Sequence, residues 1–347
     1  MKIIIIGGAG FIGINTAQYF LKKRDENHEV VIYDNCSRPG SRDNIDWLCS
    51  NYQVKYVPGD IRNYDNMESL LNEHRDTDVI IHLAAQVAVT TSVNNPRMDY
   101  ETNLSGTFNI LEALRNNNMA PFLIYSSTNK VYGALESIPI EETETRYKFT
   151  DLPGGITEKV NLDMYSPYGC SKGAADQYVR DYNRIYDIPT VVFRQSCIYG
   201  PHQYGIEDQG WVAWFIIATL LEKKVTVFGT GKQVRDILYV SDLIKAYDQA
   251  IKNKDKCRGR IFNIGGGSDN SLSILEFFST VENITGKKVQ FTHEDWRPGD
   301  QKIFISNNSS LLNETGWFPQ TSCEKGIKQT VKWIRDHLSS IRTYFSE

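Results

Sequence analysis

The sequence predicts an α/β protein, a doubly wound parallel sheet with a smaller α/β lobe at its C-terminal end. Its first strand is predicted by Ile3–Ile6, four β-branched residues without a polar interruption, typical of a strand buried on both faces. Glycines at 7, 10 and 13 then open a helix. Apolar runs of strand length alternate with helical patterns up to about residue 195, as parallel α/β sheets require, and this alternation loosens after Gly200.

The length and charge of the chain limit the classes of protein to consider. Its 347 residues suffice for one large or two closely joined domains with a substantial core. We expect residues 1–195 to form the sheet domain and residues 196–347 the smaller lobe, with segments interleaved across the boundary. The net charge of -4 leaves no basic stripe for nucleic acid, so we exclude that partner.

Cysteine and histidine spacing indicates neither disulfides nor a metal site. The six cysteines are scattered without a CxxC pair, which is typical of reduced thiols in a cytoplasmic protein. The histidines lack HxxxH spacing, so we expect no metal. Because the chain starts directly with a strand, and its longest apolar run, Trp211–Leu221, is about half the length that spans a bilayer, we expect no signal peptide and no membrane segment.

The glycine-rich turn after the first strand predicts a phosphate site. Gly7 allows the tight turn, Gly10 lets the backbone approach a pyrophosphate closely, and Gly13 lets the helix pack on the sheet. The N-terminus of that helix would face the anion. The spacing is GxxGxxG rather than GxGxxG, which indicates one branch of the dinucleotide-binding (Rossmann) folds.

The second strand, over residues 29–35, carries the acid that a dinucleotide site requires. Asp34 lies about 20 residues after the glycines, where a carboxylate accepts hydrogen bonds from the adenosine ribose and favours NAD. Arg38 would suit the 2′-phosphate of NADP, but Asp34 beside it would repel that phosphate. The alternative is a glycine turn followed by an ordinary surface aspartate.

The remaining elements of the sheet domain follow in order. Strands are expected over 54–57, 78–83, 122–125 and 190–194, and helices over 11–23, 67–74, 98–116 and 167–186. Asp60 follows a strand and would face adenine or hold a plain turn. Asn103 would reach the ribose or hold the turn above the cofactor. The small residues at 84 and 85 leave room for a ligand.

Hydroxyl-bearing residues gather where the 122–125 strand ends. Ser126, Ser127 and Thr128 come at the carboxyl edge of the sheet, where open parallel sheets bind ligands. The polar connection over 135–164 is long enough to be functional or a lid. In the smaller lobe we expect a helix from Trp211, strands over 225–228 and 235–240, and a helix over 274–286.

Tyr168 and Lys172 carry the predicted chemistry. Four residues apart, they lie on one face of a helix. A nearby ammonium and the positive nicotinamide of an oxidised cofactor both favour phenolate, so we expect the tyrosine pKa to fall towards the working pH. Such a phenolate takes a proton from a sugar hydroxyl. Tyr-xxx-Lys pairs are common on helix surfaces, but here the pair follows a dinucleotide pattern and Thr128 offers a third hydroxyl.

Together these motifs resemble the extended short-chain dehydrogenase/reductase family of nucleotide-sugar enzymes over nearly the whole chain. The resemblance is carried by the glycine turn 7–13, by Ser-Ser-Thr before Val-Tyr-Gly at 126–133, and by Tyr168-xxx-Lys172. Longer strings, at 34–40, 86–92, 125–132, 142–147, 166–177 and 208–211, are most similar to enzymes that invert C2 of a CDP-hexose.

The resemblance implies a role for each matching residue. Tyr168 would be the general base, Lys172 would lower its pKa and hold the nicotinamide ribose, and Thr128 would bond the reacting oxygen. The NAD site would be lined by Gly7, Gly10, Phe11, Ile12, Gly13, Asp34, Asn35, Ser37, Arg38, Asp60, Ile61, Leu83, Ala84, Gln86, Asn103, Tyr168 and Lys172. The substrate would be held by Gln86, Thr128, Arg235 and Arg297, the two arginines on the diphosphate. Either arginine would otherwise be a surface ion-pair partner.

One position separates reaction types within the family. By this resemblance, members that eliminate water or carbon dioxide carry Thr-Asp-Glu or Thr-Ser-Glu where this chain has Thr128-Asn129-Lys130, and they use the carboxylate as acid or base. Without that carboxylate we expect reversible oxidation and reduction of a carbinol carbon through a transient keto sugar. The alternatives are a UDP-hexose 4-epimerase, a sugar-nucleotide dehydrogenase or reductase with net NAD turnover, and a non-catalytic NAD sensor.

Several residues near the predicted site have simpler interpretations. Cys170 and Cys197 have no base at a set spacing and are expected to be packing residues. Trp211 and Trp214 would stack on the base or sugar, or form a core-facing stripe. The resemblance implies a homodimer or homotetramer, with the helices from Met98 and from Pro167 as the natural faces.

Overall fold

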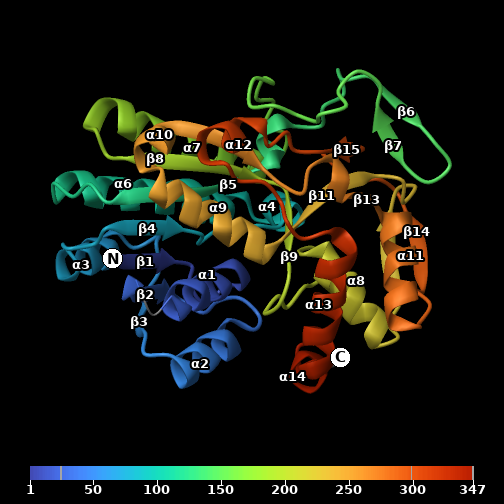
Figure 1. Cartoon of the computed structure of the whole chain (residues 1–347), viewed down its shortest axis with the longest axis horizontal. Helices are drawn as coiled ribbons and strands as arrows, with labels where there is room; N and C mark the ends of the chain where they lie inside the picture. Colours follow the sequence, from blue (N-terminus) through green and yellow to red (C-terminus); the bar gives the residue numbers. More distant parts are fainter. Residues whose placement is uncertain (24–25, 298, 346–347) are drawn as a thin grey trace.

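The large part of the molecule is a seven-stranded parallel sheet, in agreement with the predicted fold class. The computed structural model describes residues 1–23, 26–297 and 299–345. The strands run in the order β12-β8-β5-β4-β1-β2-β3 (Figure 1). Their bounds are β1 Lys2–Ile6, β2 Glu29–Asp34, β3 Lys55–Pro58, β4 Val79–His82, β5 Phe122–Thr128, β8 Thr190–Gln195 and β12 Arg260–Ile264. The order reverses between β1 and β4, which opens a crevice at the carboxyl ends of the strands.

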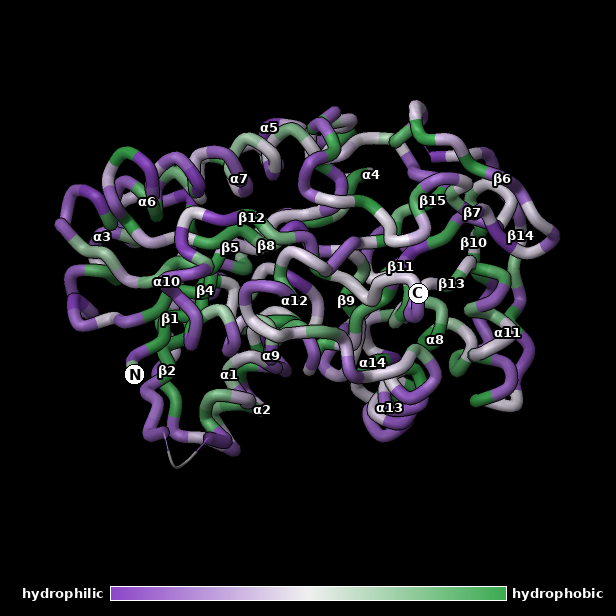
Figure 2. The backbone as a smooth tube through the Cα atoms, turned by 45° about the horizontal axis from the view of Figure 1, so that its top comes forward, coloured by the Kyte–Doolittle hydropathy of each residue, from purple (hydrophilic) through white to green (hydrophobic). Residues whose placement is uncertain are grey.

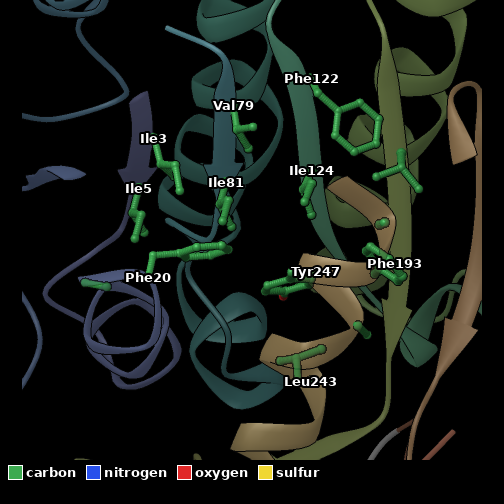
Figure 3. Close-up of a cluster of buried hydrophobic side chains, with 14 of the residues drawn as sticks. Ile3, Ile5, Phe20, Val79, Ile81, Phe122, Ile124, Phe193, Leu243 and Tyr247 are labelled. Carbon is green, nitrogen blue, oxygen red and sulfur yellow. The ribbon is translucent and has the colours of Figure 1, made fainter. Parts of the chain in front are cut away.

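Helices cover both faces of this sheet. One layer holds α1 Phe11–Lys22, α2 Ser41–Asn51 and α9 Val240–Lys252, and the other holds α3 Tyr64–Glu73, α6 Gly106–Asn116 and α7 Pro167–Tyr186. Ile3 and Ile5 pack into the first layer with Phe20 and Tyr247 (Figure 3). Ile4 and Ile6 pack into the second. This alternation is the two-residue period of a strand, and it explains the unbroken isoleucine run.

The predicted helix over 98–116 is confirmed, and it contains a π-helical turn. The structure has α4 Val89–Asn94, α5 Pro96–Tyr100, a π-helical turn over Glu101–Ser105, and then α6. The Asn95 side chain caps α5 by accepting a hydrogen bond from the Met98 amide. The π-turn adds one residue to the helical circuit and centres on Asn103, whose carbonyl accepts a hydrogen bond from Thr107 Oγ1 at 2.6 Å.

The smaller part of the molecule has its own sheets and its own core, on the right of Figure 1. Strands β13 Ser271–Ser273, β9 Cys197–Tyr199 and β15 Ile303–Phe304 pair with β11 Val234–Tyr239, and β10 Val225–Phe228 pairs with β14 Phe291–Glu294. Around them lie α8 Trp211–Leu220, α11 Ile274–Thr285, α13 Cys323–Asp336 and α14 Leu338–Thr343. Helix α8 is buried on nearly every side, so its sequence has no polar face.

The chain crosses between the two parts more than once. Helix α9 and strand β12 come after residue 196 but belong to the large sheet and its cover. The remaining short elements are α10 Lys254–Cys257, α12 Ser309–Thr315 and the 3₁₀ turns Asn129–Tyr132 and Ser268–Asn270. In Figure 2 the central strands are green and the outer helices carry purple, so the hydropathy follows the layers. None of the described helices is long and apolar enough to cross a bilayer.

The long polar connection contains a hairpin. Strands β6 Ile140–Glu142 and β7 Tyr147–Phe149 pair antiparallel. At the turn, Arg146 donates from Nε to Glu276 Oε1 at 2.9 Å and from Nη2 to the Ser271 carbonyl at 2.7 Å. These bonds tie the hairpin to the smaller part of the molecule, over the strand β13 and the start of α11.

Candidate active site

A cavity of about 560 Å³ lies between the carboxyl ends of the large sheet and the smaller lobe. Its walls come from the glycine turn, from the segments after β4 and β5, from α7, and from β9–β11 and α8. The predicted site residues that line it are Phe11, Ile12, Leu83, Thr128, Tyr168, Lys172, Arg235 and Arg297. The tertiary structure therefore brings together residues that are up to 286 positions apart in the chain (from 11 to 297).

Tyr168 and Lys172 lie in the first turns of α7, buried against the end of β5. Ser166 caps this helix by accepting a hydrogen bond from the Gly169 amide at 3.1 Å. Lys172 Nζ donates to the Ser126 carbonyl at 2.6 Å and lies 4.3 Å from the centre of the Tyr125 ring. An ammonium has three donors, so this contact leaves donors for a further acceptor in the cavity.

The pKa of Tyr168 departs from the sequence-based expectation. The pKa of Tyr168 is raised to about 12, chiefly by burial. A hydrogen bond with Thr128 and the charge of Arg38 lower this pKa, and the charge of Asp99 raises it. The pKa of Lys172 is lowered to about 7, chiefly by burial, although the charges of Asp176 and Asp99 raise it. The protein's own groups thus do not produce the expected low tyrosine pKa, because the helix buries phenol and ammonium together.

The glycine turn has the geometry of a pyrophosphate cradle. Gly7 has a φ of 86°, and a Cβ there would collide with the backbone at Ala84. A Cβ on Gly13 would lie 2.5 Å from the Gly7 carbonyl oxygen. By contrast, a Cβ on Gly10 would meet only that oxygen, at 3.3 Å, within 4 Å. The fold itself therefore requires Gly7 and Gly13, and the glycine at the start of α1 fits a close-lying pyrophosphate.

Asp34 is held at the end of β2 by backbone amides. Its Oδ2 accepts from the Ala9 amide at 3.0 Å and its Oδ1 from the Cys36 amide at 2.8 Å. Burial raises the pKa of Asp34, while these donors and Arg38 lower it. Each carboxylate oxygen keeps a lone pair for a ribose hydroxyl, so the residues fit NAD. Asn35 and Ser37 follow on an exposed loop.

Asp60 and Ile61 lie at the outer end of this region. Arg62 binds both carboxylate oxygens of Asp60 and lowers its pKa, and Asn35 Nδ2 donates to Asp60 Oδ2 at 3.0 Å. Ile61 is buried against Gly106. The plain-turn alternative for Asp60 remains open, because its carboxylate is already occupied by protein groups.

Gln86 and Asn103 lie behind the cavity wall. Asn103 Oδ1 accepts from the Gln86 amide, and its Nδ2 donates to the Gln86 carbonyl, both at 2.9 Å. Gln86 Nε2 in turn donates to Asp99 Oδ1 at 2.9 Å. The amide of Asn103 therefore holds the turn after β4, which is the second of the two roles considered for it, and neither side chain is among the residues that line the cavity.

The two predicted diphosphate arginines face the cavity from different elements. Arg235 on β11 donates from Nη2 to Asp300 Oδ1 at 2.6 Å. Arg297 lies 3.7 Å from the centre of the Phe228 ring, and its Nη2 is 3.1 Å from Asp208 Oδ1. Each arginine thus also has a carboxylate partner, as the alternative interpretation of an ion pair requires. A diphosphate would compete with these carboxylates for the same guanidinium groups.

Three charged residues of the cavity wall, Lys130, Asp208 and Asp300, were not among the predicted site residues. Lys130 and Asp300 both line the cavity, 3.5 Å apart from Nζ to Oδ1. Lys130 belongs to the string Thr128-Asn129-Lys130, and Asp300 lies three residues after Arg297, so the neighbouring predicted residues were the available signal. Asp208, also on the cavity wall, belongs to the string at 208–211.

Trp211 and Cys197 line the cavity, whereas Trp214 lies in the core and Cys170 on the surface. Trp211 lines the cavity, and its Nε1 donates to Cys197 Sγ at 3.3 Å. Trp214 is buried with its ring centre 5.4 Å from that of Phe345. Cys170 is exposed on α7. The described residues contain no group of three or more histidine, cysteine or acidic side chains that could hold a metal.

Comparisons with known proteins agree with the geometry. The family model described as GDP-mannose 4,6 dehydratase matches residues 4–330. The chain is 45% identical over 338 residues to CDP-paratose 2-epimerase of Salmonella typhi, covering 96% of this chain and 99% of that protein. It is 31% identical over 336 residues to a putative UDP-glucose 4-epimerase of Methanocaldococcus jannaschii, covering 96% and 99%.

A solved structure shares the whole fold. The crystal structure of UDP-glucuronic acid 4-epimerase from Bacillus cereus, in complex with UDP-glucuronic acid and NAD, superposes with a TM-score of 0.82 at 29% identity. The superposition covers 97% of this chain and 99% of that one. The large sheet and the smaller lobe are therefore arranged as in a protein that holds a dinucleotide and a nucleotide sugar.

Proposed function

Because this chain belongs to the GDP-mannose 4,6-dehydratase family, within the extended short-chain dehydrogenases/reductases, we propose that it is an NAD-dependent epimerase of a nucleotide sugar. The substrate is a CDP-hexose inverted at C2, CDP-paratose to CDP-tyvelose. One observation carries this proposal: a chain 45% identical over nearly its whole length to a CDP-paratose 2-epimerase has Thr128, Tyr168 and Lys172 in one cavity. Lys130, in place of the glutamate of the eliminating members, supports oxidation and reduction over elimination.

The chemistry requires a base, a hydride acceptor and a clamp. Bound NAD supplies the hydride acceptor and its positive nicotinamide ring. Tyr168 removes the proton of the C2 hydroxyl, while Thr128 donates a hydrogen bond to the oxygen that becomes the ketone. Lys172 holds the nicotinamide ribose with the donors that Ser126 does not use. Because burial and the charge of Asp99 raise the pKa of Tyr168, the phenolate depends on a positive charge placed beside it.

The second half of the reaction requires the sugar to present its other face. Arg235 and Arg297 hold the diphosphate, and the hexose turns about its link to that diphosphate. NAD would supply the hydride exchange at C2, and once the opposite face is presented Tyr168 gives the proton back to the oxygen. The two parts of the chain divide this work: residues 1–195 hold NAD and the catalytic side chains, and residues 196–347 hold the nucleotide sugar.

The proposal is tested by incubating the purified protein, without added NAD, with CDP-paratose, CDP-glucose and UDP-glucose in heavy water. Ring protons of the sugar are followed by NMR. We expect inversion of a CDP sugar at C2 with its C2 hydrogen retained, because hydride returns directly. Inversion of UDP-glucose at C4 would favour the 4-epimerase alternative, which the relative from Methanocaldococcus jannaschii supports. Deuterium at C2 would contradict the hydride mechanism.

We infer that the enzyme is a homodimer or homotetramer in the cytoplasm. Aromatic side chains are exposed along α5, α6 and α7: Tyr100, Phe108, Tyr178 and Tyr186. The rings of Phe108 and Tyr178 are in edge contact, with centres 5.5 Å apart. Apolar side chains gathered on neighbouring helices favour contact with a second copy. We expect light scattering to give at least twice the 39.6 kDa chain mass, and Tyr178→Glu to lower it. All six cysteines are free, as the reducing compartment requires.

A further inference from the structure

Lys130 lies in the cavity two residues beyond Thr128. Its amide donates to Thr128 Oγ1 at 3.3 Å, and its carbonyl accepts from the Gly133 amide at 3.2 Å. That carbonyl also packs against the start of α7, because a Cβ on Gly169 would lie 3.1 Å from it. The backbone of Lys130 is therefore fixed against the residues that carry Tyr168 and Thr128, and its side chain starts at the reacting end of the cavity.

The ammonium of Lys130 is poorly satisfied by the protein. Its Nζ is 3.5 Å from Asp300 Oδ1, and the same oxygen already accepts from Arg235 Nη2 at 2.6 Å. Within the described part of the chain, Asp300 is the one carboxylate within 4 Å of this ammonium. The side chain is 19% exposed, so water cannot fully replace the missing acceptors. A buried ammonium with one long ion pair and two spare donors requires further oxygen acceptors.

We propose that Lys130 is a third substrate-binding cation, which donates hydrogen bonds to a hydroxyl or keto oxygen of the hexose and is paired with Asp300. This inference rests on the proposed function and names a further contact of the same site. The order of residues along the cavity supports the hexose as its target. Thr128, which holds the reacting oxygen, is on one side of Lys130, and Asp300 separates Lys130 from the diphosphate arginine Arg235.

The charge state of Lys130 matters for the keto intermediate. As an ammonium it donates to oxygen, whereas a neutral amine beside a ketone is a base and a nucleophile. Burial and the charge of Arg235 lower the pKa of Lys130, and Asp300 and Cys197 raise it. Asp300 thus favours the donor form. Lys130 therefore cannot act as the glutamate does that eliminating members of the family carry at this position. An ammonium has no lone pair with which to remove a proton from carbon.

Binding measurements separate a hexose contact from a nucleotide contact. The affinities of CDP and of CDP-paratose are measured by calorimetry on the enzyme as purified, for the parent and for Lys130→Met, Lys130→Arg and Arg235→Met. We expect Lys130→Met to weaken CDP-paratose by about 10- to 100-fold, as lost hydrogen bonds to a charged group do, and to leave CDP within about twofold. Lys130→Arg retains a donor and should recover part of the loss. Arg235→Met should weaken both ligands.

Two controls make the result decisive. Lys328→Met removes an exposed lysine on α13 that does not line the cavity, and should change neither affinity. Thermal unfolding shows whether each variant is folded. If folded Lys130→Met binds CDP-paratose as the parent does, or loses CDP equally, the inference is wrong. If the parent converts only UDP-glucose, the substrate proposal fails instead, and the same comparison is made with UDP and UDP-glucose.

A pH profile tests the role of Asp300 separately from packing. Because the protonated Lys130 binds the sugar, kcat/KM should fall as the pH rises through its pKa. Asp300→Asn removes the charge that raises this pKa, so the fall should move to lower pH, with Arg235 and Cys197 as the remaining neighbours. An unmoved alkaline limb would refute that role. A Tyr168→Phe variant that still turned over substrate would instead contradict the proposed mechanism.

Discussion

Substituting the glycines of the first turn separates what the fold requires from what the ligand requires. Gly13→Ala would place a Cβ 2.5 Å from the Gly7 carbonyl oxygen and 2.5 Å from Gly8 Cα, so the backbone must move. Overpacking of this kind costs about 1–3 kcal/mol, and the higher helix propensity of alanine returns up to about 1 kcal/mol. We expect Gly13→Ala to lower the free energy of unfolding by about 1–2 kcal/mol.

Gly10→Ala should behave in the opposite way. Its φ of -71° and ψ of 169° suit alanine, and the new Cβ would meet only the Gly7 oxygen at 3.3 Å. The loss of the glycine cap costs at most about 1 kcal/mol. The methyl group would nevertheless lie where the pyrophosphate must approach, so we expect NAD affinity to fall by about 10- to 100-fold, the equivalent of about 1.4–2.8 kcal/mol.

Urea unfolding of each variant gives the stability, and calorimetric titration of NAD into protein stripped of nucleotide gives the affinity. The reasoning is refuted if Gly10→Ala binds NAD as tightly as the parent, or if Gly13→Ala is as stable as the parent. In the first case the cradle does not hold the pyrophosphate. In the second, the close contact with Gly7 is relieved by a movement that costs little.

Three further perturbations follow from the site. Tyr168→Phe should lower kcat by about 10²- to 10⁴-fold, as loss of a general base does, while NAD stays bound, and steady-state kinetics with a nucleotide assay checks both. Burial holds the pKa of Lys172 at about 7, below its unfolded value. Between these two pKa values the unfolded chain binds a proton that the folded protein lacks, so Lys172 makes the free energy of unfolding rise with pH in that window. Urea unfolding of Lys172→Met from pH 7 to 10 should therefore show a smaller rise than the parent. An equal rise in the two proteins would contradict the low pKa of Lys172. Asp176 is fully buried and accepts hydrogen bonds from Arg194 Nε at 2.8 Å and from Ser127 Oγ at 2.9 Å. Asp176→Asn should therefore lower the free energy of unfolding by about 3–5 kcal/mol, as the loss of one partner of a buried ion pair does. A loss under about 1 kcal/mol would contradict a buried ion pair.

The sequence failed where a side chain's role depends on what lies beside it in space. It did not show that Gln86 and Asn103, which stay predicted NAD-site residues, also bond to each other where the turn after β4 meets the π-turn. The expected fall in the pKa of Tyr168 took account of Lys172 and of nicotinamide, and it omitted the burial that raises this pKa and the charge of Asp99. Contacts between distant segments leave no periodic signal in the chain, so no local pattern predicted the Gln86–Asn103 bonds or the raised pKa of Tyr168.

The sequence by itself determined the parallel sheet, the glycine turn, Asp34 at the end of the second strand, and the four-residue spacing of Tyr168 and Lys172 on one helix. These features are local: strand and helix periodicity, the turn and the four-residue helical spacing are set within a few residues of backbone. Only the tertiary structure decided that Arg235, Asp300 and Lys130 form one connected group of charges at the cavity. Three separate segments supply them, and their charges interact through a buried, low-dielectric site that exists only after β11 and the 299–301 segment have packed against the end of β5.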